Sequence, residues 1–202
     1  MDNYWDTRYS VEEYIYGTKP NAFFKSIIDT LQPGKILVPA AGEGRDAIYA
    51  AKLGWEVFAV DQSVVAQQKA LQLAQDEHVT INYQVCDILD FDLTQRKYNA
   101  IVLNYFHLPP DIRMQFHSKL HSVLLPNGYI ILEAFNPKQL NNTSGGPQDG
   151  NVLMTADALK QEFSALQILE CGEHEIILDE GTHHQGKADI VRFVGKNTNP
   201  VS

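Results

Sequence analysis

The sequence lacks a disulfide framework, a long apolar run and an excess of positive charge. Only Cys86 and Cys171 occur in its 202 residues, and their spacing fits neither a disulfide scaffold nor a zinc site. No stretch approaches the roughly 18 consecutive apolar residues of a membrane helix, so we expect no membrane insertion. The first thirty residues mix acids with aromatics and do not resemble a secretion signal, so we expect a cytoplasmic location.

The charge balance constrains the partners. The 16 basic and 25 acidic side chains give a formal net charge of −9. Nucleic-acid affinity comes largely from clustered Lys and Arg, so we expect no nucleic-acid partner and a neutral or cationic small molecule instead. The length fits a single domain over residues 1–202, as a monomer or a homodimer.

Apolar periodicity alternates between strand and helix through most of the chain. Strands are expected at about 35–39, 55–60, 79–85, 99–104 and 129–134, with helices at 44–53, 63–76 and 110–124. A helix near 155–164 then precedes two strands, 166–178 and 187–194, which form a C-terminal hairpin over 166–195. We therefore predict an α/β fold: a doubly wound, seven-stranded, mostly parallel sheet with an antiparallel last strand and helices on both faces.

Two segments depart from this alternation. Residues 1–30 are rich in aromatic side chains and contain a helix that starts after Pro20, so they form either a lid or a packing layer. Residues 135–153 are polar and contain glycine, and we expect a mobile loop there because loops of this length in compact domains are usually functional or mobile.

A tight glycine turn, Gly42-Glu43-Gly44-Arg45, joins the first strand to the next helix. Such turns let backbone N–H groups approach a nucleotide-type ligand at a helix N-terminus. Asp61 closes the second strand, where a carboxylate can accept both hydroxyl groups of a ribose, and Asp87 closes the third. Each acid could instead cap a turn, but together they indicate a ligand at the carboxyl edge of the sheet.

These motifs resemble a known family. Gly42 to Arg45, Val57 to Ser63 and Asp87-Ile88 look like the first three cofactor motifs of class I S-adenosylmethionine-dependent methyltransferases, which are Rossmann-like, and the C-terminal hairpin is similar to theirs. Trp5-Asp6-x-Arg8-Tyr9 and Tyr16-Gly17-x-x-Pro20-Asn21 resemble the small bacterial tellurite-resistance and thiopurine-methyltransferase-like group. The chain departs from the family at Val38 and Ala40, where an acid and a glycine are usual.

The resemblance implies S-adenosyl-L-methionine as the cofactor. It implies that Gly42 and Gly44 approach the methionine part, that Asp61 holds the ribose, and that Asp87 with Ile88 meets the adenine. Either Tyr16 or Arg8 would close over the cofactor from the N-terminal segment. The complete set of expected cofactor-binding residues is Arg8, Tyr16, Ala40, Gly42, Gly44, Arg45, Asp61, Gln62, Asp87, Ile88 and Asn104.

The acceptor side is expected along Asn104 to Pro110, which follows the fourth strand. His107 is the candidate catalytic residue there, and a loop histidine satisfied by the backbone is the alternative. The two prolines come five residues too late for the Asn-Pro-Pro-Tyr type of motif of amine methyltransferases. Glu133 and the loop Ser144 to Pro147 are expected to wall the acceptor pocket, with structural hydrogen bonding as the alternative for Glu133.

The C-terminal hairpin carries further polar side chains. His183 and His184 are adjacent, so in an extended segment they point to opposite faces and are not expected to bind a metal. The hairpin acids are expected on a solvated face: Glu173, Glu175, Asp179 and Glu180.

The predicted function is S-adenosylmethionine-dependent methyl transfer to a small molecule, with a soft nucleophile such as a thiol or a chalcogen oxyanion as one class of acceptor. A soft anion would need no general base. A nicotinamide-dependent oxidoreductase is an alternative, because Gly42-x-Gly44-x-x-Ala47 satisfies the loose dinucleotide pattern. A non-catalytic S-adenosylmethionine-binding module is another.

Overall fold

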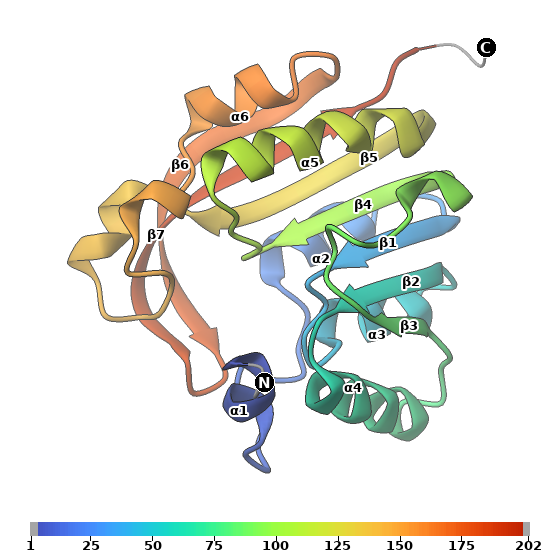
Figure 1. The fold of residues 1–202 in the computed structure, drawn as a ribbon, viewed down its shortest axis with the longest axis vertical. Helices are drawn as coiled ribbons and strands as arrows, with labels where there is room; N and C mark the ends of the chain where they lie inside the picture. Colours follow the sequence, from blue (N-terminus) through green and yellow to red (C-terminus); the bar gives the residue numbers. More distant parts are fainter. Residues whose placement is uncertain (1–3, 200–202) are drawn as a thin grey trace.

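A single seven-stranded sheet organises the protein, as the computed structural model of residues 4–199 shows (Figure 1). The strand order is β3-β2-β1-β4-β5-β7-β6. β7 runs antiparallel to both of its neighbours, and the pairs among β1 to β5 are parallel, which confirms the predicted fold class. The strands are β1 (Lys35–Pro39), β2 (Glu56–Asp61), β3 (Asn82–Val85), β4 (Tyr98–Asn104), β5 (Leu124–Phe135), β6 (Gln167–Glu180) and β7 (His184–Lys196).

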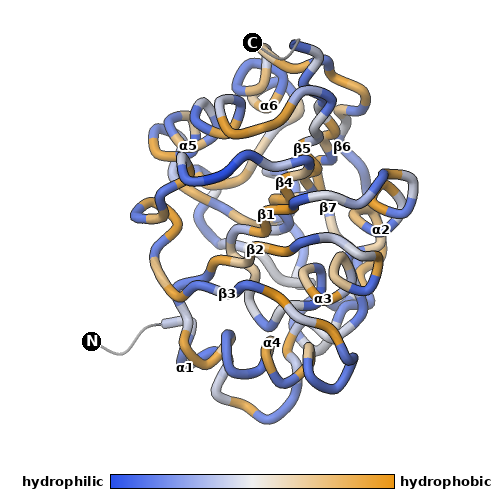
Figure 2. The backbone as a smooth tube through the Cα atoms, turned by 90° about the vertical axis from the view of Figure 1, so that its right-hand side faces the viewer, coloured by the Kyte–Doolittle hydropathy of each residue, from blue (hydrophilic) through white to orange (hydrophobic). Residues whose placement is uncertain are grey.

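Helices cover both faces of the sheet because successive side chains of a strand point to opposite sides. Along β1, Ile36 and Val38 pack in one apolar cluster with α2 and α3, whereas Leu37 packs in another with α5. Figure 2 shows hydrophobic segments along β1, β2 and β4 in the interior of the molecule. The α-helices are α1 (Tyr4–Tyr9), α2 (Ala22–Ile28), α3 (Arg45–Lys52), α4 (Val64–Asp76), α5 (Pro110–Val123) and α6 (Ala156–Glu162).

The position of the reversal in strand order matters for function. Successive crossovers from β1 lead outward to β2 and β3, and the chain then returns to place β4 on the other side of β1. In open α/β sheets, ligands bind at the carboxyl ends of the strands beside such a reversal. The loops after β1, β2 and β4 are therefore the expected walls of a ligand site.

The boundaries of β5 and of the hairpin strands differ from the predicted ones. β5 begins at Leu124, directly after α5, because Pro126-Asn127-Gly128 forms an irregularity within the strand, where Asn127 has a φ of 61° and the register against β4 shifts. The hairpin strands reach Glu180 and restart at His184, which leaves only residues 181–183 as the turn.

The loop after β5 contains two short 3-10 helices, Pro137–Asn141 and Gly150–Val152. It is tied to β7 because Ser144 Oγ donates to Lys187 O at 2.5 Å and Asn136 Nδ2 donates to Ile190 O at 3.0 Å. Its mobility stays a prediction. Within residues 4–199, no helix has the length and apolar character needed to cross a bilayer.

Candidate functional site

A cleft of about 500 Å³ lies at the carboxyl ends of β1, β2 and β4. Its walls come from the loops that follow these strands, from α1 and Tyr16, and from residues 146–152 and His184. All but one of the residues predicted to bind the cofactor or act in catalysis line it: Arg8, Tyr16, Ala40, Gly42, Arg45, Asp61, Gln62, Asp87, Ile88, Asn104 and His107. The structure thus brings these residues together around one cleft, and their roles in cofactor binding and catalysis stay predictions.

The glycine turn after β1 is held from two sides. Gly42 has a φ of 52°, its N–H donates to Asp61 Oδ2 at 2.9 Å, and its carbonyl accepts a hydrogen bond from Tyr83 Oη at 2.7 Å. A Cβ at this position would lie 2.8 Å from Tyr9 Oη. The absence of a side chain thus lets the turn lie against Tyr9 while it faces the cleft.

Gly44 has a different role from the predicted one, since it is not among the residues that line the cleft. It precedes α3 with a φ of 89°, and a Cβ there would lie 2.6 Å from Ile48 Cδ1 and 2.7 Å from Ala70 Cβ. The second glycine of the motif is therefore needed for the close packing of α3 on α4.

Asp61 both caps a turn and faces the cleft, which are the two alternatives that its position in the sequence allows. Its Oδ1 accepts the N–H of Ser63 at 2.9 Å, so it caps the turn before α4, and its carboxylate also lines the cleft. Burial raises the pKa of Asp61, while the N–H groups of Ser63 and Gly42 act in the opposite direction. A carboxylate can accept about four hydrogen bonds, and the N–H groups of Ser63, Gly42 and Gln62 take three of these positions, so capacity remains for a ligand hydroxyl.

Asp87 lies in the cleft wall after β3, beside Ile88 and Leu89. Its side chain is exposed, and Oδ1 accepts the N–H of Leu89 at 2.9 Å, which is a turn-capping contact. The next residue, Ile88, is buried and presents an apolar surface. The pair thus offers one polar edge and one apolar face to the cleft.

The N-terminal segment forms one wall of the cleft. Asp6 anchors α1 to the start of α4, because its Oδ1 accepts from Ser63 Oγ at 2.6 Å. Arg8 Nε donates to Tyr16 Oη at 3.3 Å, and Tyr9 is buried beneath them. The aromatic residues of this segment therefore pack against the body of the protein and also contribute to the site.

Asn104, at the end of β4, places an amide in the cleft wall. Its Nδ2 donates to Asp46 Oδ2 at 2.8 Å, and Asp46 Oδ1 accepts the N–H of Asn21 at 2.7 Å. Asn104 Oδ1 is buried and has no hydrogen-bond partner among the residues that the structure describes. An acceptor in this condition is suited to a donor group of a ligand.

His107 lines the cleft, but the backbone already engages both of its ring nitrogens. Nδ1 lies 3.1 Å from Val152 O, and Nε2 accepts the N–H of Phe135 at 3.4 Å. Burial lowers the pKa of His107 to about 4, so the ring is neutral at pH 7. This arrangement matches the alternative of a backbone-satisfied histidine and leaves no ring nitrogen for proton transfer.

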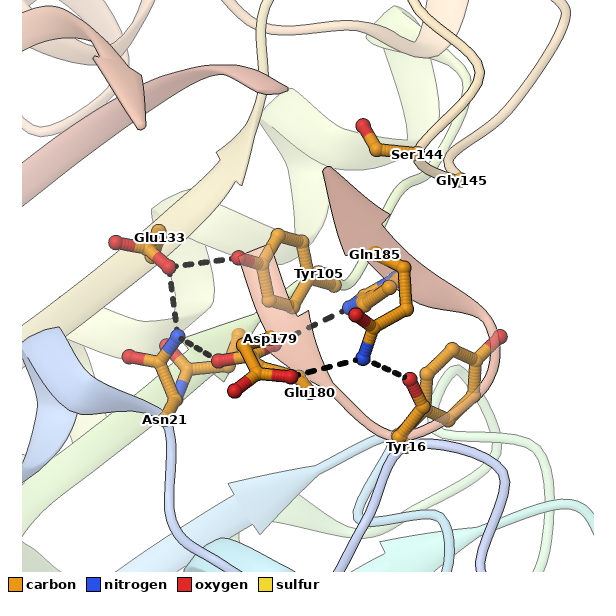
Figure 3. Close-up of polar contacts among 12 residues, drawn as sticks. Tyr16, Asn21, Tyr105, Glu133, Ser144, Gly145, Asp179, Glu180 and Gln185 are labelled. Carbon is orange, nitrogen blue, oxygen red and sulfur yellow. Dashed lines mark hydrogen bonds and ion pairs between the residues drawn. The ribbon is translucent and has the colours of Figure 1, made fainter. Parts of the chain in front are cut away.

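Glu133 has structural partners and is absent from the cleft lining. Its Oε1 accepts from Asn21 Nδ2 at 2.6 Å and from Tyr105 Oη at 2.7 Å, and Figure 3 shows these side chains pointing toward one another. Arg192 Nε donates to the other oxygen at 2.8 Å. The alternative of structural hydrogen bonding therefore applies, and the prediction of a wall residue is wrong.

Glu180 corrects the prediction of a solvated hairpin face. Its side chain is only 14% exposed and pairs with Arg45 at 2.9 Å between Nη2 and Oε2. The cause is the position of the hairpin turn, which packs against residues 15–17 and brings the N–H of His183 within 3.2 Å of Ile15 O. Arg45 is predicted to bind the cofactor. Its guanidinium instead pairs with Glu180 and donates to Tyr16 O at 3.1 Å.

His184 is one of the cleft-lining residues that sequence reasoning missed. It is buried, lines the cleft, and lies 3.2 Å from Glu180 Oε2 through Nδ1. Glu180 and His184 are paired across the hairpin. The sequence offers a signal for this pair, because Gly181, which has a φ of 66°, marks a three-residue turn between the two residues. His183 beside it is exposed, as strand alternation requires, and residues 4–199 contain no group of three or more His, Cys, Asp or Glu that could hold a metal ion.

A family comparison connects this site to a known domain. The model of a methyltransferase domain family matches residues 36–128, which include the glycine turn, Asp61 and Asp87. Residues 36–128 are therefore similar to a methyltransferase domain. No relative among curated protein sequences matches the chain.

Three solved structures share the fold. A structure from work on the conversion of a disulfide bond into a thioacetal group during echinomycin biosynthesis has 16% identity and a TM-score of 0.78, over 97% of this chain and 91% of that chain. TehB from Haemophilus influenzae has 16% identity and a TM-score of 0.71, over 96% and 66%. The N-methyltransferase NodS from Bradyrhizobium japonicum, in complex with S-adenosyl-L-homocysteine, has 14% identity and a TM-score of 0.66, over 98% and 90%.

Proposed function

We propose that this protein transfers the methyl group of S-adenosyl-L-methionine to a small molecule that carries a soft nucleophile. The enzyme class follows from the methyltransferase domain, and S-adenosyl-L-methionine is its cofactor. The observation that carries the proposal is the hydrogen bond from Gly42 to Asp61 at the reversal of strand order, because it joins a close-approach turn to a ribose-binding acid.

The described side chains fit this cofactor. Asp61 would accept the ribose hydroxyls, Asp87 and Ile88 would contact the adenine, and the backbone of Ala40 and Gly42 would approach the methionine part. Asn104, whose buried Oδ1 has no partner among the described residues, would supply an acceptor for the ammonium group of that part once its side chain turns toward the cleft. When bound, S-adenosyl-L-methionine supplies a methyl group that is attacked in line by the acceptor. The residues of the cleft hold the two reactants in contact, which supplies roughly 7–11 kcal/mol in favourable systems.

A soft acceptor is supported by the character of the cleft beyond Asn104. Tyr105, Phe106 and Phe135 line that part and offer polarizable aromatic surface. Two of the structures that share the fold are also consistent with it. One belongs to work on the conversion of a disulfide into a thioacetal, which is sulfur chemistry, and the other is TehB, a hint toward the tellurite-resistance-like group. A thiol or a chalcogen oxyanion is therefore the proposed class, in a cytoplasmic protein.

Isothermal titration tests the cofactor. S-adenosylmethionine and S-adenosylhomocysteine should bind with one site per chain, and NADH should not. Binding of NADH without S-adenosylmethionine would favour the nicotinamide-dependent oxidoreductase and overturn the proposal.

Formation of S-adenosylhomocysteine tests the reaction. Small thiols, chalcogen oxyanions and amines are screened at fixed S-adenosylmethionine concentration. Steady product with a soft nucleophile and none with amines supports the proposal. Cofactor binding without product from any acceptor would point to the non-catalytic binding module.

A further inference from the structure

An aromatic compartment occupies the β5–β7 side of the cleft, opposite to the side of Asp61 and Asp87. The His184 ring lies at its centre, with ring centroids at 4.6 Å from Tyr16, 4.6 Å from Tyr105 and 5.4 Å from Phe135. The hydroxyl of Tyr105 is already used, because it donates to Glu133. His184 therefore brings the distinctive chemistry to this compartment.

The two ring nitrogens of His184 have different surroundings. Nδ1 donates to Glu180 Oε2 at 3.2 Å, which fixes the tautomer with the proton on Nδ1. Nε2 has no hydrogen-bond partner among residues 4–199, while the residue itself lines the cleft. A carboxylate that holds one nitrogen of a histidine and leaves the other with a lone pair is the arrangement of a general base.

Glu180 is itself fixed in place. Its Oε2 also accepts from Arg45 Nη2 at 2.9 Å, and its Oε1 accepts from Asn21 Nδ2 at 3.3 Å. Burial acts to raise the pKa of Glu180, but the hydrogen bond from His184 and the Arg45 guanidinium together lower it, so the carboxylate is ionised. An ionised partner both orients the imidazole and stabilises the imidazolium that forms when Nε2 takes a proton.

We propose that His184, oriented by Glu180, is the general base of the transfer, and that the acceptor enters the cleft as a neutral thiol. This inference rests on the proposed methyltransferase function. The S–H proton moves to Nε2, the sulfur forms the new bond to the methyl carbon, and the electron pair of the broken carbon–sulfonium bond stays on the departing thioether. The protonated His184 then returns the proton to solvent.

The surroundings of His184 suit a neutral acceptor. An oxyanion would face the lone pair of Nε2, Arg45 is paired with Glu180, and Arg8, the other cation whose charge reaches the ring, donates to Tyr16. An ammonium ion beside the ring would meet a carboxylate whose charge is already paired with Arg45. A neutral thiol needs only a proton acceptor and an aromatic surface.

The protonation state of His184 is consistent with the role. Burial lowers its pKa, the hydrogen bond to Glu180 raises it, and the charges of Arg45 and Arg8 lower it, with a net shift below the ordinary value. The remaining titratable groups in contact with the ring are the phenols of Tyr16 and Tyr105, and His107 also acts on it electrostatically. At pH 7 the ring is neutral, as a base must be.

The test compares His184→Gln with His183→Gln, a neighbouring exposed histidine outside the cleft lining. The probes are benzyl mercaptan, which is protonated at pH 7, and 4-nitrothiophenol, which is already a thiolate. His184→Gln should lose roughly 10²- to 10⁴-fold in rate with benzyl mercaptan and less than about tenfold with 4-nitrothiophenol. His183→Gln should stay within about twofold of the unaltered protein with both.

A second measurement does not depend on turnover. The ¹⁵N shifts of the His184 ring, assigned by its loss in His184→Gln, should show a neutral ring protonated on Nδ1 at pH 7. Glu180→Gln should remove this tautomer preference. A ring protonated on Nε2 in the unaltered protein would overturn the inference.

The outcomes separate the inference from the proposed function. Failure of the unaltered protein to bind S-adenosylmethionine in isothermal titration overturns the proposed function. Binding with turnover of oxyanions or amines but of neither thiol overturns only the acceptor class. An equal loss with both thiols in His184→Gln, or no loss, shows that His184 is not the base although the protein is a methyltransferase.

Discussion

The backbone nitrogen of Gly42 lies 2.9 Å from Oδ2 of Asp61, so the turn after β1 and the acid that ends β2 form one unit. This hydrogen bond helps to hold both the turn and the carboxylate in their observed positions. The N–H of Gly42 helps to keep a carboxylate that is only 8% exposed in place, and the carboxylate holds a turn whose φ is positive. Substitutions in this unit should therefore separate ligand binding from stability.

Asp61→Ala should weaken S-adenosylmethionine binding at least 100-fold in isothermal titration. The variant unpairs two ribose hydroxyls, and a hydrogen bond to a charged group contributes about 1.5–3 kcal/mol. Asp157→Ala, which removes an acid whose side chain is 86% exposed, is the control and should leave the affinity unchanged. Unchanged affinity in Asp61→Ala would remove the ribose from this position.

Gly44→Ala should lower the free energy of unfolding by about 1–3 kcal/mol, because its Cβ would overlap Ile48 and Ala70 at the α3–α4 contact. Gly42→Ala should instead act mainly on S-adenosylmethionine affinity, since its Cβ meets Tyr9 Oη beside the cleft. Urea unfolding and isothermal titration of both variants check the distinction. A larger affinity loss in Gly44→Ala than in Gly42→Ala would contradict it.

Ala40→Gly should raise the free energy of unfolding by up to about 1 kcal/mol. Ala40 has a φ of 49°, a left-handed conformation that costs a residue with a Cβ roughly 1–2 kcal/mol. Part of this gain is offset by the greater freedom of glycine in the unfolded chain. Ala41→Gly, one residue further along and without a positive φ, is the comparison and should be destabilising.

Acidification should destabilise the protein through its buried histidines. The pKa of His107 is about 4 in the folded state and about 6.5 when unfolded, so the unfolded state binds more protons between these values. Stability is then lost as the pH falls through that window, by about 2 kcal/mol between pH 7 and pH 5 from this residue. The pKa values of His117 and His184 are also lowered, chiefly by burial, so they act in the same direction.

Urea unfolding of His107→Gln at both pH values checks this contribution. The variant should lose less stability than the unaltered protein over the same interval. His174→Gln, at an exposed position on β6, is the matched control and should show the full loss. Equal losses in all three proteins would exclude a role for His107 in the acid response.

The fold could be predicted from the sequence because its signals are local. The apolar runs that became β1, β2 and β4 are each followed by a helical pattern, and such repetition admits few topologies other than a parallel sheet. The residues of the glycine turn, Asp61 and Asp87 reach the same edge for the same reason. Their placement follows from strand direction alone and needs no knowledge of packing.

The features that the sequence did not predict depend on contacts between segments that lie far apart along the chain. The sequence predicts a solvated Glu180 because it does not show that the hairpin packs on residues 15–17, and Arg45 lies 135 positions away from it. It predicts a ligand contact for Gly44 because a local motif does not show that Ala70 on α4 lies close by. His107 was the obvious histidine beside the fourth strand, whereas His184 reaches the cleft only through the antiparallel return of the chain.

The contact of the hairpin with residues 15–17 also bears on how the protein is made. Ile15 and Gly17 are synthesised early, and their partners His183 and Gly181 are synthesised about 165 residues later. Until then the aromatic compartment lacks its histidine and Arg45 lacks its carboxylate. A nascent chain that has completed β1 to β5 therefore still lacks the wall of the cleft that His184 supplies, and this wall is added only when synthesis is almost finished.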